Sequence, residues 1–76
     1  MADATRRFRA ENDSALLYNI AMTAVVEYMR GHPVDFLMGP LDSGKMVDEG
    51  MWVSGPDLEG VSDAITRVPG LHEVDA

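Results

Sequence analysis

The chain has 76 residues, of which 46% are apolar and 25% are charged, with a formal net charge of −7 and no cysteine. This composition predicts one folded domain spanning residues 1–76, and a domain of this size buries only about 60% of the surface that its unfolded chain exposes. The lack of cysteine excludes disulfides and thiolate chemistry. The excess of acids argues against direct binding of nucleic acid or anionic membranes, because phosphate contacts need Lys and Arg.

The acidic charge is concentrated in one part of the chain. Residues 1–30 carry four basic and four acidic side chains, whereas residues 31–76 carry two basic and nine acidic ones. Such a charge distribution favours partners with a basic surface. Acids also keep small domains in solution, so the sequence leaves a purely solubilising role open.

Residues 1–10 allow three structures. They form a flexible arm, an extra helical turn, or an edge strand in which residues 4–10 place Phe8 inward and their arginines outward. The arginines precede an uncharged stretch, residues 14–26, which is shorter than the roughly 18 residues of a membrane span. No small-residue cleavage site follows it. We therefore expect a cytoplasmic protein without a membrane segment.

A first helix is predicted from the capping residues at 12–14 to the stop signal at 31–33, Gly-His-Pro. Its polar residues gather in one narrow stripe and leave roughly two-thirds of the circumference apolar. Such a helix is either packed inside its own domain or in contact with a second subunit. In the second case we expect a homodimer or other homo-oligomer held together by Met22, Val25, Tyr28 and Met29.

The middle of the chain predicts two strands joined by a turn. Residues 34–38 alternate as a short strand, and residues 39–44 supply Gly, Pro, Asp and Ser for the turn. Residues 45–53 predict a second extended stretch with a β-bulge or another turn at Gly50. We expect Trp52, in this stretch, to anchor the core.

The segment GPLDSGKM, residues 39–46, matches all but the last position of the phosphate-loop signature G-x-x-x-x-G-K-[ST]. A working phosphate loop needs a helix whose first amides face the phosphates, and a Ser or Thr that holds Mg²⁺. Met46 stands in place of the Ser or Thr, and residues 45–53 show no helical period. The sequence therefore predicts a turn and no nucleotide cofactor.

A second helix and a closing strand complete the predicted domain. The helix begins near residues 54–57, Ser-Gly-Pro-Asp, and ends at Pro69-Gly70, and residues 71–75 form the strand. With a strand at residues 4–10 the order is β-α-β-β-α-β, which resembles the ferredoxin-like sandwich; without it the order is α-β-β-α-β. Both are α+β folds, and this resemblance implies no function by itself.

Few residues offer catalytic chemistry. The chain's two histidines, His32 and His72, are far apart in the sequence, and no cysteine is present to complete a tetrahedral metal site. Neither Ser43 nor Ser54 lies in a nucleophile-elbow context. We therefore predict no metal, no cofactor and no catalytic residue.

These observations predict a small acidic, non-enzymatic binding protein. It would act as an inhibitor that occupies a basic surface of a nucleic-acid-handling protein, and its size and charge are similar to those of phage-encoded inhibitors such as anti-CRISPR proteins. A small dimeric α+β-barrel enzyme and a structural subunit of a larger assembly remain as alternatives. The candidate partner-binding residues are Asp42, Asp48, Glu49, Glu59 and Asp63.

Overall fold

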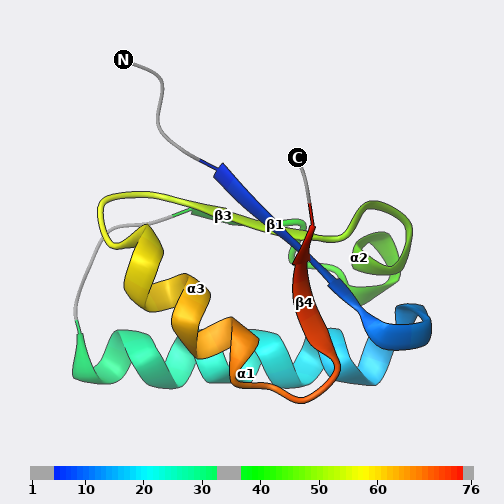
Figure 1. The fold of residues 1–76 in the computed structure, drawn as a ribbon, viewed down its shortest axis with the longest axis horizontal. Helices are drawn as coiled ribbons and strands as arrows, with labels where there is room; N and C mark the ends of the chain where they lie inside the picture. Colours follow the sequence, from blue (N-terminus) through cyan, green and yellow to red (C-terminus); the bar gives the residue numbers. More distant parts are fainter. Residues whose placement is uncertain (1–4, 33–36, 75–76) are drawn as a thin grey trace.

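The computed structural model describes residues 5–32 and 37–74, which form a small α+β domain. In these residues one antiparallel sheet has the strand order β2-β3-β1-β4, and Figure 1 shows helices α1 and α3 on the same side of it. The strands are β1 (Thr5–Ala10), β2 (Leu37–Gly39), β3 (Met51–Ser54) and β4 (Leu71–Val74). The helices are α1 (Ala15–Gly31), α2 (Ser43–Glu49) and α3 (Leu58–Thr66), with a 3-10 turn at Glu11–Asp13.

Strand β1 lies inside the sheet, with β3 on one side and β4 on the other. The expectation of an edge strand, a helical turn or a flexible arm is therefore wrong for residues 5–10, while residues 1–4 lie outside the described residues. Phe8 is fully buried under the helices, as predicted. Arg7 and Arg9 alternate onto the opposite face, where their guanidinium groups reach the end of α2. This contact explains how an arginine-rich strand occupies a central position.

Helix α1 begins and ends where the sequence predicts. Ser14 is its N-cap and accepts a hydrogen bond from the backbone N–H of Leu17 at 3.4 Å. Tyr18, Ala21 and Val25 are fully buried against the sheet and the other helices. Much of the apolar surface of α1 therefore packs inside this domain.

Helix α2 corrects the prediction that residues 45–53 form an extended stretch interrupted only at residues 48–50. Asp42 caps the helix by accepting from the N–H of Gly44 at 2.8 Å, and Gly50 ends it with a φ of 80°. Met46 is the residue of α2 that is fully buried in the core. A helix of two turns with one buried position leaves too little periodicity for a sequence pattern to reveal it. Gly50 is thus the C-cap of α2, in place of the predicted β-bulge or turn within an extended stretch.

Strand β3 places Met51 and Val53 in the core, and both are fully buried. Trp52 points to the other face of the sheet and is partly exposed, so the prediction that it anchors the core is wrong. Its indole packs over Gly39 of β2, where an added Cβ would lie 2.6 Å from a ring carbon. Of the strand predicted at 34–38, residues 34–36 lie outside the described residues, and β2 is Leu37–Gly39.

Helix α3 and strand β4 follow the predicted pattern. Val61 and Ile65 of α3 are fully buried, and Leu71 at the start of β4 is 7% exposed. Because strand residues alternate between faces, Glu73 shares with Leu71 the side of the sheet that carries the helices. In the described part of the chain, no helix is long and apolar enough to cross a membrane.

Candidate functional site

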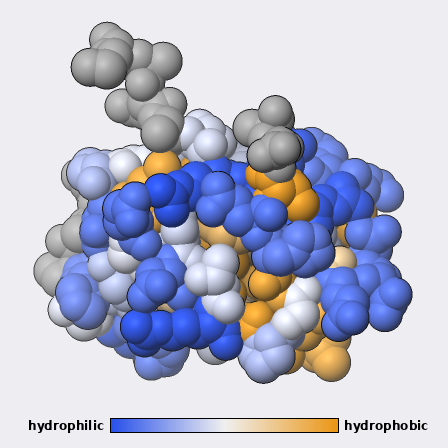
Figure 2. All heavy atoms as spheres, viewed as in Figure 1, coloured by the Kyte–Doolittle hydropathy of each residue, from blue (hydrophilic) through white to orange (hydrophobic). Residues whose placement is uncertain are grey.

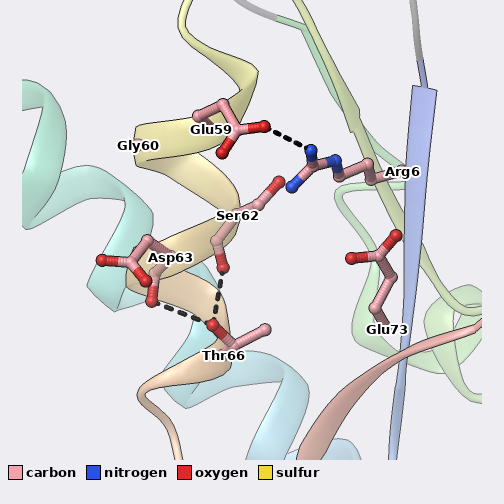
Figure 3. A pocket seen from close by; sticks show the side chains of 7 residues that line it. All are labelled: Arg6, Glu59, Gly60, Ser62, Asp63, Thr66 and Glu73. Atoms are coloured by element: carbon pink, nitrogen blue, oxygen red, sulfur yellow. Dashed lines mark hydrogen bonds and ion pairs between the residues drawn. The ribbon is translucent and has the colours of Figure 1, made fainter.

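A polar hollow of about 380 Å³ opens between α3 and the neighbouring strands β1 and β4. Figure 3 shows the side chains that enter it from both sides. The face of the molecule on which α3 and β4 lie is largely hydrophilic (Figure 2). The hollow is lined by Arg6 of β1, by Glu59, Ser62, Asp63 and Thr66 of α3, and by Glu73 of β4.

The spacing of the α3 residues explains why they meet here. Glu59, Ser62, Asp63 and Thr66 are three or four positions apart, which places them along one side of a helix. Strand β4 contributes Glu73, which is opposite Phe8 in the register with β1 and therefore on the helix side. The hollow is thus lined by side chains from one side of α3 and by one side chain from β4.

An ion pair spans the mouth of the hollow. A guanidinium nitrogen of Arg6 lies 2.6 Å from Oε1 of Glu59, and the side chains are 31% and 87% exposed. A pair this exposed contributes no more than about 1 kcal/mol to stability. The pair places a guanidinium between α3 and the sheet.

Ser62 is the buried polar residue of the site. It is 3% exposed, and its Oγ has no hydrogen-bond partner among the described residues. The nearby hydroxyl of Thr66 is satisfied, since it donates to the backbone carbonyls of Ser62 and Asp63 at 3.1 Å. In Figure 3 the hydroxyl of Ser62 points toward the guanidinium of Arg6. An unpaired buried hydroxyl costs about 1–3 kcal/mol, so its presence calls for an explanation.

The carboxylates give the hollow a negative charge. Asp63 forms an ion pair with Arg67 at 3.0 Å, one turn further along α3, and Glu59 is paired with Arg6. Glu73 forms no ion pair within residues 5–32 and 37–74. Of the three acids at the hollow, Glu59 is paired with Arg6 and the carboxylate of Asp63 turns toward Arg67, so Glu73 supplies the net negative charge, which favours a cationic ligand.

A second, smaller hollow of about 240 Å³ lies on the other side of Gly60, between α3 and the end of α1. Here the hydroxyl of Tyr28 donates a hydrogen bond to the carboxylate of Asp57. This hydrogen bond, together with burial, raises the pKa of Tyr28 above its usual value. The ring of His32 stacks on Tyr28 with 4.4 Å between the ring centroids. The contact ties the end of α1 to the start of α3.

The structure divides the predicted partner-binding acids into two groups. Glu59 and Asp63 lie at the hollow, whereas Asp42, Asp48 and Glu49 belong to α2 and its N-cap. Figure 1 places α2 and α3 toward different ends of the molecule. The structure therefore does not join the five acids into one face, and their role in binding remains a prediction. Sequence reasoning assigned no role to Glu73, although alternation from the apolar Leu71 would have placed it on the helix side.

The predicted self-association residues are also separated. Val25 is fully buried and has no surface for a second subunit, so this assignment is corrected. Met22 is partly buried against the core, and Tyr28 is bound to Asp57. Met29 is 42% exposed. The other large exposed apolar residues of α1 are Leu16, Ile20 and Val26.

The phosphate-loop-like segment is followed by a helix after all, since α2 begins at Ser43. The sequence argument that no helix follows it is therefore wrong. Two other features oppose a phosphate at this helix. The carboxylate of Asp42 already accepts from the N–H of Gly44 at 2.8 Å, and Met46, at the position of the metal-binding Ser or Thr, is fully buried.

His32 and His72 are both exposed. Within the described ranges, no cluster of three or more His, Cys, Asp or Glu side chains could hold a metal ion. Comparisons with family models, with curated proteins and with solved structures found no match. The larger hollow, lined by residues of α3, β1 and β4 and called the α3–β4 hollow below, is the feature of the structure that bears most directly on function.

Proposed function

We propose that the protein is a non-enzymatic binding protein whose α3–β4 hollow docks on a basic surface of a partner protein. The observation that carries this proposal is that Glu59 and Glu73, from two separate elements, lie at one hollow, with the carboxylate of Asp63 on the adjacent exposed side of α3. Acids grouped on and beside a concave surface focus a negative potential, which speeds association with a basic protein and selects against acidic ones.

The class of partner follows from the charge of the whole chain. A net charge of −7 is complementary to proteins that bind nucleic acid, because these carry clusters of Lys and Arg. An acidic domain bound to such a cluster would block access of the nucleic acid. We therefore propose an inhibitor of a nucleic-acid-handling protein, similar in size and charge to phage anti-CRISPR proteins.

The proposal is tested by capturing partners from the source cell on wild-type protein and on variants. Reversing Glu59, Asp63 and Glu73 to Lys should abolish retention of basic, nucleic-acid-binding proteins. Reversing Asp48 and Glu49, on α2, tests the other acidic group and should leave retention intact. Retention that is equal on wild type and on the first variant would contradict a role for the hollow.

We further propose that the fold is a ferredoxin-like sandwich with one added helix. The strand order β2-β3-β1-β4 and the alternation of β1, α1, β2, β3, α3 and β4 support this assignment, with α2 inserted between β2 and β3. The fold alone assigns no activity. An experimental structure with a different strand order would contradict it.

A second candidate function is the dimeric α+β-barrel enzyme, in which two sheets pack face to face. The sheet face opposite the helices favours it, because Leu37 is 67% exposed there and Trp52 is partly exposed. Arg7 and Arg9 argue against this enzyme, since they place two charged groups on the sheet face that the dimer would bury. Substituting Trp52 with Arg would dissociate such a dimer, whereas a binding protein that does not associate through this sheet face would keep its mass in solution.

A further inference from the structure

We propose that the α3–β4 hollow accepts the guanidinium group of an arginine side chain from the partner protein. This inference rests on the proposed function and names the group that the hollow recognises. The nearest precedent is in the chain itself, because the guanidinium of Arg6 already binds Glu59 at the mouth of the hollow at 2.6 Å. The space beside it, about 380 Å³, is lined by polar side chains.

The unpaired hydroxyl of Ser62 points to a ligand that donates hydrogen bonds. Ser62 is 3% exposed and lines the hollow, yet its Oγ has no partner within residues 5–32 and 37–74. A Ser hydroxyl accepts through its lone pairs, so an N–H entering beneath Arg6 would satisfy it. Movement of the Arg6 side chain, which is held by one exposed ion pair, would open this path.

The acceptor groups around the hollow favour a cation that carries several hydrogen-bond donors. The hydroxyl of Ser62 approaches from α3 and the carboxylate of Glu73 from β4, so acceptors face the space from two directions (Figure 3). A guanidinium offers five N–H donors in a planar fork and can reach both sides at once. An ammonium offers three donors around a single point. The arrangement therefore favours arginine over lysine.

The test uses three small probes that separate charge from shape. N-acetyl-arginine amide, N-acetyl-lysine amide and N-acetyl-citrulline amide are titrated into isotope-labelled protein, and amide chemical shifts are followed by NMR. Citrulline keeps the planar shape of arginine but has no charge. We expect the arginine probe to shift the amides of Ser62, Asp63 and Glu73. We expect the lysine probe to bind at least about threefold more weakly and the citrulline probe not to bind.

Two variants and a matched control locate the site. Glu73→Gln removes the carboxylate charge that lacks an ion pair, and Ser62→Ala removes the buried hydrogen-bond acceptor. Each substitution should weaken binding of the arginine probe by at least about threefold. Glu27→Gln removes one carboxylate from the exposed side of α1 and should bind like wild type. Equal binding of arginine and citrulline probes, or unchanged binding in both site variants, would overturn the inference.

The same variants distinguish this inference from the proposed function. If a captured partner is lost on reversal of Glu59 and Asp63 but binds Ser62→Ala and Glu73→Gln normally, the acidic face is correct and the arginine pocket is wrong. If the arginine probe binds as expected and the captured partners are unaffected by the reversals, the pocket is correct and the proposed function is wrong.

Discussion

At the scale of single residues, the buried hydroxyl of Ser62 lowers the stability of the fold but leaves a hydrogen-bond acceptor available to a ligand. Its hydroxyl is buried without a partner in the described part of the chain, and an alanine would fit the same space without the polar atom. We therefore predict that Ser62→Ala raises the free energy of unfolding by about 1 kcal/mol. Urea denaturation followed by circular dichroism measures the difference. A loss of stability would mean that the hydroxyl is hydrogen-bonded in the folded protein.

A second residue-scale prediction concerns Tyr28. Its hydrogen bond to Asp57 raises the pKa of the phenol in the folded protein, whereas the unfolded chain keeps a value of about 10. The stabilisation is therefore complete below that unfolded pKa and is lost as the pH rises through the higher folded value. We predict that Tyr28→Phe loses this decline of stability at alkaline pH. Thermal unfolding of both proteins at a series of pH values measures it, and equal slopes would contradict the prediction.

The site residues could be predicted from the sequence only in part. The spacing of Glu59 and Asp63 placed both acids on the exposed side of a helix, and this was correct because the helix has a clear apolar face. Glu73 and Arg6 join them only through the pairing of β1 with β4, which depends on the register of strands from opposite ends of the chain. No local pattern encodes such a register.

At the scale of secondary-structure elements, Gly60 sets the distance between α1 and α3. An added Cβ would overlap the hydroxyl of Tyr28 and would lie 2.7 Å from a carboxylate oxygen of Asp57. Alanine normally stabilises a helix interior relative to glycine by up to about 1 kcal/mol. We predict the opposite sign here, a destabilisation of about 1–3 kcal/mol for Gly60→Ala, because the tight contact must open.

The control for this prediction is a variant without the obstructing group. In a Tyr28→Ala background, Gly60→Ala should cost less or become stabilising, since the nearest obstacle is gone. Denaturant midpoints of the four proteins give the coupling free energy. An equal cost in both backgrounds would show that Tyr28 is not the obstacle.

Helix α2 shows why an element can escape sequence analysis. Its carboxyl end is held from outside, because Arg7 donates to the carbonyl of Glu49 at 2.9 Å and Arg9 donates to that of Val47 at 3.1 Å. Cations at this end also complement the helix dipole. Since both arginines come from β1, far away in the sequence, part of what stabilises α2 lies outside its local sequence, although Asp42 and Gly50 mark its ends. The longer helices α1 and α3 carry their own stop signals and apolar faces, and both were predicted.

At the scale of the whole molecule, the apolar side chains of α1 that stay exposed to solvent offer a surface for self-association. Leu16 is 67% exposed and Ile20, one turn later, is 43% exposed. We predict that a homo-oligomer forms through this part of α1, and that Leu16→Glu with Ile20→Glu weakens it by at least about tenfold. Sedimentation velocity over a range of concentrations measures the effect. A wild-type protein that stays monomeric at every concentration would contradict the prediction.

The charge of the whole molecule gives the last prediction. If the acids at the hollow engage a basic partner, association should be fast at low salt and slower as ionic strength rises, since the Debye length is about 10 Å at 0.1 M. Reversing Glu59 and Asp63 to Lys should slow association at low salt by at least about tenfold. The fold should survive, because the two side chains are 87% and 65% exposed and their ion pairs contribute little.

The measurement is stopped-flow association with the captured partner across a salt series, with circular dichroism to verify folding. Glu11→Lys with Glu27→Lys is the matched control, since it reverses two exposed acids away from the hollow. If only the total charge matters, both double variants slow association equally. If the α3–β4 hollow is the contact, the Glu59 and Asp63 variant is slowed much more, because a local potential acts most strongly on a partner that docks there. Equal on-rates for wild type and this variant at low salt would show that the exposed side of α3 takes no part in binding, and would leave its acids with a solubilising role.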